Sequence, residues 1–213
     1  MSLKDLILAE GASLTDKQAS KLEVMKQEIL RYQRTTNLIG SGTVSQIDQV
    51  HFLDSLKGAW ILKNWISKTR LDIQKLWDLG SGNGFPGLIL ATQLDLDIHL
   101  VERDKKKAEI LRRIAYLMDL KRVFVVAEDL RNVSGPIDFA VSRGFSSIQQ
   151  QLEWLDPLTN AGSWIVMWKG PEYSEELTTL HGSTWNLDSQ VEYSTPAKVG
   201  LRLLFWKKAA EGR

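Results

Sequence analysis

The residues best suited to chemistry lie in one glycine-rich stretch, WDLGSGNGFPGLILA, which spans Trp77–Ala91. An apolar run leads to Asp78, and Gly80, Gly82 and Gly84 follow before a second apolar run begins. This pattern predicts a strand, a turn with free backbone N–H groups and the N-terminus of a helix. Such a turn can hold a nucleotide-like ligand at the end of the strand.

Two classes of ligand fit this stretch. The segment Gly82-x-Gly84-x-x-Gly87 has the GxGxxG spacing, and Glu102 closes the next apolar run where an acid would bond ribose hydroxyls. Dinucleotides and S-adenosylmethionine both fit this pattern. A turn that binds no ligand and only packs the strand against the helix would also explain the glycines, but not the acidic residues. Asp78 distinguishes between the two ligand classes, because a carboxylate repels the pyrophosphate of a dinucleotide and attracts the ammonium group of S-adenosylmethionine. We therefore expect S-adenosylmethionine as the cofactor.

The elements that position these residues alternate from Lys75 onward, as is typical of βαβ units and a parallel sheet. The expected strands are KLWDLG, DIHLVE, RVFVVAED, IDFAVSRG and SWIVMWKG, and the expected helices are Gly87–Leu94, Lys105–Met118, Ile148–Leu158 and Glu172–Leu180. Two further runs, STWNLDSQVEYST and LRLLFWKKA, follow without a helix between them. They predict an antiparallel hairpin around Pro196–Gly200 that closes the sheet.

The first 70 residues have a helical pattern instead. Thr15-x-x-Gln18 has the form of a capping box, and a further helix is expected over Ser45–Ile66. The apolar residues after the capping box share one helical face: Leu22, Met25, Ile29 and Tyr32. We expect residues 1–70 to form a helical extension packed on a main domain of residues 71–213.

Composition excludes several classes of protein. The 213 residues suffice for one sizeable core, and no apolar run approaches the roughly 18 residues of a membrane span. Asp5 and Glu10 interrupt the N-terminal apolar residues, so we expect no secretory signal and a cytoplasmic location. The chain has no cysteine, which excludes disulfides and thiolate nucleophiles. With 27 Lys+Arg against 26 Asp+Glu, any nucleic acid must bind to a local patch.

The pattern D-x-G-x-G-x-G-F-P-G resembles the cofactor loop of the glucose-inhibited division protein B family, the bacterial ribosomal small subunit methyltransferases. Further family signatures are matched in the same order by Asn37-Leu38, His51-Phe52-Leu53-Asp54-Ser55, Val141-Ser142-Arg143-Gly144-Phe145, Met167-Trp168-Lys169-Gly170 and Arg202. The resemblance implies an α/β class I S-adenosylmethionine-dependent methyltransferase fold. This fold is a mostly parallel, Rossmann-like sheet of seven strands with an antiparallel last strand.

The resemblance also implies the site residues. The cofactor would be bound by Asp78, Gly80, Gly82, Gly84, Phe85, Glu102, Glu128, Asp129 and Arg143. Glu102 would bond the ribose, and Glu128 with Asp129 would lie along the adenine. We expect Arg143, Lys169 and Arg202 to form a cationic rim that positions an RNA phosphate or the base edge. No residue is expected to act as a catalytic base.

Two absences narrow the acceptor of the methyl group. Amino-group methyltransferases commonly carry an Asn/Asp-Pro-Pro-Tyr/Phe sequence after the fourth strand, where this chain has Ser142-Arg143-Gly144-Phe145. Methylation of a pyrimidine carbon needs a cysteine nucleophile, which is absent. Guanine N7 has a lone pair and no proton to lose, so it needs positioning and little acid–base help. The resemblance accordingly implies 7-methylguanosine formation in 16S ribosomal RNA, by a monomer that binds this RNA or the small ribosomal subunit.

Two other functions stay open at this stage: an NAD(P)-dependent oxidoreductase that uses the same glycine loop, and a non-catalytic RNA-binding ribosome-assembly factor. The stretch Arg103–Arg122 has eight basic and three acidic residues, which fits an RNA-backbone patch and a solvated helix face equally well. His51, Asp54 and Ser55 have the residue types of a hydrolase triad, but their spacing gives them no reason to converge. We expect structural or RNA-docking roles for them, and no metal site.

Overall fold

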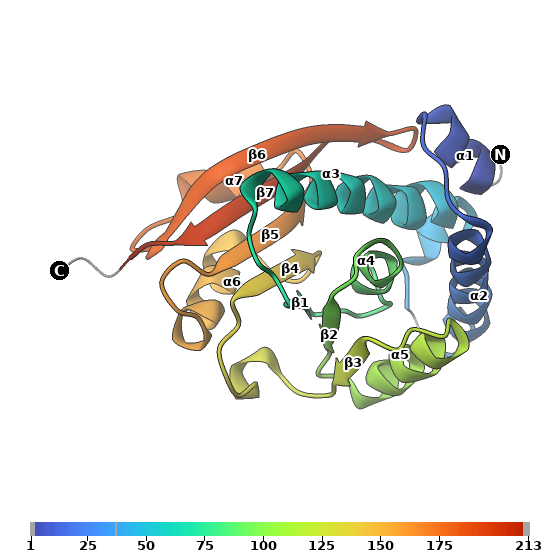
Figure 1. Ribbon diagram of the computed structural model, residues 1–213, viewed down its shortest axis with the longest axis horizontal. Helices are drawn as coiled ribbons and strands as arrows, with labels where there is room; N and C mark the ends of the chain where they lie inside the picture. Colours follow the sequence, from blue (N-terminus) through green and yellow to red (C-terminus); the bar gives the residue numbers. More distant parts are fainter. Residues whose placement is uncertain (1–2, 37, 211–213) are drawn as a thin grey trace.

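A seven-stranded sheet runs through the middle of the protein (Figure 1). The computed structural model describes residues 3–36 and 38–210, so the predicted signature residue Asn37 lies outside the described residues. The strands are β1 (Lys75–Leu79), β2 (Asp97–Val101), β3 (Val123–Val126), β4 (Phe139–Arg143), β5 (Trp164–Lys169), β6 (Trp185–Thr195) and β7 (Lys198–Lys208). Their order is β3-β2-β1-β4-β5-β7-β6. Strands β1 to β5 are parallel, and β7 lies antiparallel between β5 and β6.

Helices cover both faces of this sheet. They are α1 (Leu3–Ala9), α2 (Asp16–Gln33), α3 (Asp54–Thr69), α4 (Gly87–Gln93), α5 (Lys105–Leu117), α6 (Ile148–Leu155) and α7 (Tyr173–Thr178). Short helical segments are η1 (Ser41–Gln46), η2 (Asp48–Leu53), η3 (Leu130–Asn132) and η4 (Asp156–Leu158). Figure 1 shows α3, α4 and α5 on one side of the sheet and α6 and α7 on the other, with α1 and α2 outside the first layer. None of the described helices is long and apolar enough to cross a bilayer.

Successive side chains of each strand point to opposite faces of the sheet, and this divides the core into two clusters. In β5, for example, Val166 and Trp168 face the cluster shared with α1 to α5, whereas Ile165 and Met167 face the cluster shared with α6. The first cluster also contains Met25 of α2. The N-terminal helices therefore bury their apolar faces in the same core as the sheet, and a domain boundary at residue 70 stays a prediction.

The expected sheet, its antiparallel closure and the five parallel strands are confirmed. The capping box is also confirmed, since the Thr15 hydroxyl accepts the Gln18 N–H and the Gln18 side chain accepts the Thr15 N–H. The helix predicted over Ser45–Ile66 differs: α3 begins at Asp54, after the 3₁₀ segment η1 and the π-helical turn η2. All five residues from Phe52 to Leu56 are buried, which one regular helical stripe does not achieve.

The C-terminal hairpin also turns more tightly than predicted, because only Pro196 and Ala197 separate the paired strands. Its two strands have 11 residues each, and β6 contacts both η2 and α3. In Figure 1 the tip of this hairpin reaches over α3 toward α1. The last two strands therefore bring residues near position 195 beside residues near position 50.

Candidate active site

The glycine loop joins β1 to α4 at the carboxyl edge of the parallel strands. Gly80, Gly82 and Gly84 have φ values of +68°, +51° and +90°, a region that favours glycine. A Cβ atom on Gly80 would lie 2.2 Å from the Phe145 ring. The N–H of Ser81 donates to the carbonyl of Val101 over 2.9 Å. The loop is therefore fixed against β2; all three positions have a backbone conformation that favours glycine, and Gly80 and Gly84 also lack space for a Cβ.

Asp78 lies beneath this loop. Its carboxylate is buried and accepts the N–H of Gly87 at the start of α4 over 3.1 Å, while its second oxygen has no partner among the described residues. Burial raises the pKa of Asp78 to about 7. Asp78 lines neither cavity beside the loop. A contact with the methionine ammonium stays a prediction, whereas the contact with the α4 N-terminus is visible.

Glu102 follows β2 and is almost completely buried. One carboxylate oxygen accepts the N–H of Gly82 over 2.9 Å, and the other accepts the N–H of Asp104 over 2.8 Å. Glu102 therefore ties the glycine loop to the start of α5, and it also lines the smaller of two cavities.

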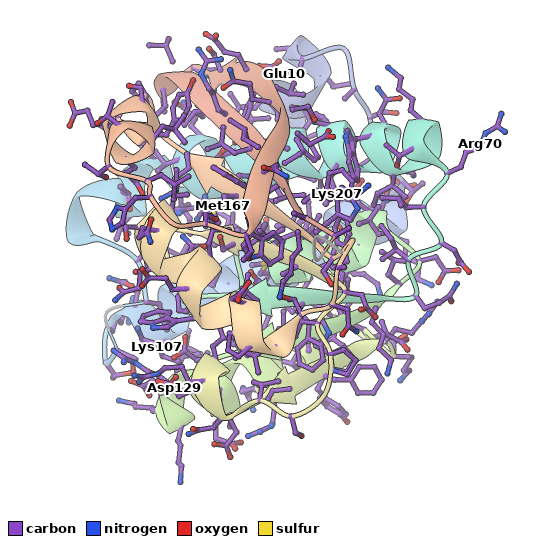
Figure 2. All side chains as sticks on the ribbon, turned by 90° about the vertical axis from the view of Figure 1, so that its left-hand side faces the viewer. Glu10, Arg70, Lys107, Asp129, Met167 and Lys207 are labelled. Carbon is purple, nitrogen blue, oxygen red and sulfur yellow. The ribbon has the colours of Figure 1, made fainter. Side chains whose placement is uncertain are left out.

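Two cavities flank the loop, with volumes of about 690 Å³ and about 300 Å³. Gly80, Gly82 and Gly144 line both of them. The larger cavity is also lined by His51, Asp54, Asn83, Phe85, Arg143, Trp168, Lys169, Tyr193 and Lys198, among others. The smaller is also lined by Glu102, Arg103, Lys107, Glu128, Asp129, Phe145 and Trp154, among others. In Figure 2 the labelled Lys107 and Asp129 lie together at one corner, far from Arg70, which precedes β1.

The larger cavity contains a hydrogen-bonded cluster around Arg143, at the end of β4. Its Nη1 donates to Asp54 Oδ2 over 2.8 Å, and its Nη2 contacts His51 Nδ1 over 2.8 Å. The other oxygen of Asp54 accepts the Tyr193 hydroxyl over 2.5 Å. Phe85 lies against the cluster, with its ring 5.4 Å from that of His51 and 5.2 Å from Arg143 Cζ.

Burial, followed by the positive charges of Arg143 and Lys198, lowers the pKa of His51 to about 3. The imidazole is therefore neutral. His51 and Asp54 do not form a hydrolase triad, but they converge on Arg143, which the sequence analysis did not anticipate. Their i, i+3 spacing on a helix was the available signal, whereas the partners from β4 and β6 depend on the sheet topology.

The three residues of the expected cationic rim all have acidic partners. Arg143 pairs with Asp54, Lys169 Nζ lies 2.8 Å from Glu176, and Arg202 Nη2 lies 2.6 Å from Glu192. Arg143 and Lys169 line the larger cavity, and Arg202 does not, although its Cα pairs with that of Lys169 across β5 and β7. The structure thus brings two of the three to the cavity, each with its charge balanced.

The predicted adenine-side acids both line the smaller cavity. Glu128 is exposed, and Asp129 caps η3 and accepts from the Arg131 guanidinium over 2.8 and 2.9 Å. The Arg131 hydrogen bonds lower the pKa of Asp129 to about 2. Asp129 is therefore ionised, and it stands beside the cavity that Glu102 also lines.

The basic stretch 103–122 divides into paired and unpaired residues. Its ion-paired members are Arg112 with Glu109, Arg113 with Glu28, Lys121 with Asp119, and Arg122 with Asp95 and Asp97. In the part of the chain that the structure describes, Arg103, Lys105 and Lys107 have no ion pair. Leu111 of α5 and Met118, which caps its C-terminus, are buried in the core. No group of three or more metal-ligating side chains occurs among the described residues.

Comparison with solved structures places the fold. MtNAS in complex with MTA and tNA matches with a TM-score of 0.61 at 13% identity, over 88% of this chain and 70% of that chain. A predicted O-methyltransferase from Agrobacterium tumefaciens matches with a TM-score of 0.54 at 20% identity, over 66% and 76%. The shared architecture is the class I methyltransferase fold.

Comparison of sequences places the family. A ribosomal RNA small subunit methyltransferase G 3 of Bdellovibrio bacteriovorus is 31% identical over 182 residues, 83% of this chain and 80% of that protein. A ribosomal RNA small subunit methyltransferase G of Rhodospirillum rubrum is 34% identical over 170 residues, 78% and 79% of the two chains. The family model for rRNA small subunit methyltransferase G matches residues 18–204. The glycine loop and both cavities lie within these limits, and the chain belongs to the rRNA small subunit methyltransferase G family.

Proposed function

We propose that the chain transfers a methyl group from S-adenosylmethionine to N7 of a guanine in 16S ribosomal RNA of the small ribosomal subunit. The observation that carries the proposal is the glycine loop between two cavities at the carboxyl edge of a class I methyltransferase sheet, in a chain of this family. The nicotinamide-dependent alternative gains no support from the family match.

The residues around the loop fit S-adenosylmethionine. Gly80, Gly82 and Gly144 separate a larger cavity from a smaller one without side chains of their own, which leaves room for an elongated ligand along the backbone. Glu102 and Glu128 supply carboxylates to the smaller cavity, where ribose hydroxyls and the adenine edge need acceptors. Asp78 is proposed to attract the ammonium group of the cofactor from below the loop, although its buried carboxylate lines neither cavity.

When it is bound, S-adenosylmethionine supplies an electrophilic methyl group on a sulfonium. The protein's own residues then have one main task, because N7 of guanine needs no base to remove a proton. They hold the base in line with the methyl group and exclude water. Phe85, Trp168 and Tyr193 contribute aromatic side chains to the lining of the larger cavity, which suits a purine base.

Incubation of the protein with methyl-labelled S-adenosylmethionine and unmodified small-subunit RNA tests the proposal. We expect label in 16S RNA, and mass-spectrometric mapping should find it in 7-methylguanosine. Naked RNA, precursor particles and mature subunits are all offered as substrate. Absence of label in every form would favour the non-catalytic assembly factor, and thermal stabilisation by NAD(P) but not by S-adenosylhomocysteine would favour the oxidoreductase.

Lys169 is proposed to act on RNA and not on the cofactor. Its ammonium group donates to the Ser146 carbonyl and to Glu176, so it also holds the loop after β4. Lys169→Ala should lower turnover on RNA about tenfold and leave the affinity for S-adenosylhomocysteine nearly unchanged, as measured by calorimetry. An equal loss of cofactor affinity would show that Lys169 acts on the cofactor side.

We also propose that the protein acts as a monomer in the cytoplasm, where small-subunit RNA is assembled. Light scattering at micromolar concentration tests the first part, and a mass of twice the chain would contradict it.

A further inference from the structure

Arg143 is held in a restricted environment in the wall of the larger cavity. Its Nη1 donates to Asp54 Oδ2 over 2.8 Å and to the Val50 carbonyl over 3.4 Å, and its Nη2 contacts His51 Nδ1 over 2.8 Å. The guanidinium also lies over the Phe85 ring. Three hydrogen bonds and an aromatic contact therefore fix its plane.

The partners of Arg143 are themselves held in place. The Thr43 hydroxyl donates to the Gly40 carbonyl over 2.9 Å, and it lies 2.9 Å from His51 Nε2. Thr43 is therefore the acceptor toward the ring, so Nε2 carries the hydrogen of the neutral imidazole and Nδ1 accepts from Arg143. Asp54 is held by the Tyr193 hydroxyl through its other oxygen. Arg143 cannot turn without breaking this set of hydrogen bonds.

A guanidinium has five N–H donors. In the described part of the chain, the Nε hydrogen of Arg143 and one hydrogen of Nη2 have no partner, although Arg143 lines the cavity. Arg143 therefore has donors available, at a fixed position in the cavity wall, for an acceptor of the ligand that fills the cavity.

The charge of Arg143 indicates which acceptor this is. Asp54, with a side chain that is 9% exposed, already neutralises the guanidinium. A phosphate or a carboxylate therefore gains little Coulomb energy there, and it would lie close to the Asp54 carboxylate. A neutral carbonyl oxygen carries no net charge for Asp54 to repel, and it can accept the same hydrogen bond from Arg143.

Guanine has such an oxygen, O6, beside N7 on the same edge of the base. Adenine has an amino donor there, which would face the donors of Arg143. We infer that Arg143, positioned by His51 and Asp54, selects guanine by donating to O6 and not to N7, because the N7 lone pair must attack the methyl group. This inference rests on the proposed function, since it concerns the base that enters the same cavity.

The test uses 16S RNA ligated to carry one of three nucleosides at the mapped target position. Guanosine and inosine have both O6 and N7, whereas 2-aminopurine riboside has N7 but lacks O6. With the wild-type protein, kcat/KM for inosine should lie within about threefold of that for guanosine, and 2-aminopurine should be at least about tenfold slower.

The bases also differ in the intrinsic reactivity of N7. This difference is the same for every protein, so it cancels when the ratio of rates is compared between variants. The double substitution Arg143→Met with Asp54→Asn removes both charges together, so that no buried charge is left unpaired. It should lower the guanosine to 2-aminopurine ratio at least about fivefold. His51→Phe keeps a ring against Phe85 but removes the acceptor, and it should lower the same ratio by a smaller factor. Arg122→Gln, at an ion-paired arginine that lines neither cavity, is the matched control and should keep the wild-type ratio.

Melting shifts with S-adenosylhomocysteine show whether each variant is folded and binds the cofactor. His51→Phe should match the wild-type shift, and the ratios are measured at saturating S-adenosylmethionine because Arg143 is also an expected cofactor residue. A wild-type protein that methylates guanosine and 2-aminopurine equally well would overturn the inference alone, as would unchanged ratios in the Arg143 and His51 variants. A loss of the melting shift in both variants would overturn it too, because Arg143 would then serve the cofactor. If guanosine RNA is never methylated, the proposed function fails as well.

Discussion

The two cavities beside the glycine loop differ in how their cations are held. In the larger one, Arg143 and Lys169 are half-buried and paired with Asp54 and Glu176, whereas Lys198 at its edge is exposed and has no ion pair among the described residues. In the smaller one, Arg103 and Lys107 have no ion pair among the described residues, and Lys105 follows on the same exposed end of α5. The paired cations of the larger cavity have fixed geometry and balanced charge, whereas those of the smaller have free charge and freedom to move.

This difference separates two tasks that the expected cationic rim combined. Paired and buried groups orient a ligand with little net attraction, because each charge is already compensated. Unpaired exposed cations attract a polyanion over distance and act through the release of its counterions. Substitutions at the larger cavity should therefore change stability and turnover, and substitutions on α5 should change affinity and its salt dependence.

The largest effect is expected where both cavities share a wall. Gly80→Val should abolish S-adenosylhomocysteine binding, because φ is +68° and a Cβ would lie 2.2 Å from Phe145. Calorimetric titration measures this. Gly82→Ala is the control, since its φ is also positive but the nearest atom would be 3.7 Å away, and it should weaken binding far less. Wild-type affinity in Gly80→Val would mean that the loop does not carry the cofactor.

At the larger cavity, Asp54→Ala leaves Arg143 and Tyr193 without their shared acceptor. We expect a loss of about 3 kcal/mol in the free energy of unfolding, measured by urea titration. Asp95→Ala breaks an ion pair with Arg122 in which the aspartate side chain is 95% exposed, and should change stability little. Equal effects of the two substitutions would show that the cluster around Arg143 is not fixed as described.

Beneath the loop, Asp78 should make stability depend on pH. Its pKa is raised from 3.8 to about 7, so the folded state binds the proton more tightly than the unfolded state between these values. Stability is therefore lost as pH rises from about 4 to 7, by up to about 1.4 kcal/mol per pH unit, and the loss is complete above 7. Asp78→Asn removes this dependence.

Urea unfolding of Asp78→Asn and wild type at pH 5, 6, 7 and 8 measures the effect. The variant's stability relative to wild type should increase up to pH 7 and then stay level. The pKa of His51 is lowered to about 3, so its protonation also reduces the stability of the folded protein as the pH falls below 6.5. This contribution is the same in both proteins and cancels in the difference between their stabilities. A difference that is constant with pH would place the titration elsewhere.

The smallest effect concerns α5. Replacing Arg103, Lys105 and Lys107 by Gln should reduce the slope of log affinity against log salt for 16S RNA by about 2, since each phosphate contact contributes about 0.7 to 0.9. Filter binding at several salt concentrations measures the slope. The ion-paired Arg112, Arg113 and Arg122 changed to Gln give a control of equal charge, with a smaller expected change. Identical slopes for both triple variants would favour the solvated helix face.

Much of the fold was predictable because its signals are local. The alternation of apolar runs and helices, the capping box and the glycine spacing each depend on a few neighbouring residues, and all appear in the structure. The π-helical turn η2 was not predicted, because it packs against α1 and β6, which are distant from it in the sequence.

The sequence predicted which residues lie at the site better than it predicted which residues they contact. Arg143 and Phe85 do line the larger cavity, and Glu102 lines the smaller. The acidic partners of Arg143, Lys169 and Arg202 were missed, because each lies on another element or across a hairpin. Which cation is neutralised depends on tertiary pairing, and a single sequence carries no local signal for that.

The hydrogen bond between Asp54 and Tyr193 joins residues 139 positions apart. This wall of the larger cavity therefore cannot close before β6 has been synthesised and has packed against η2 and α3.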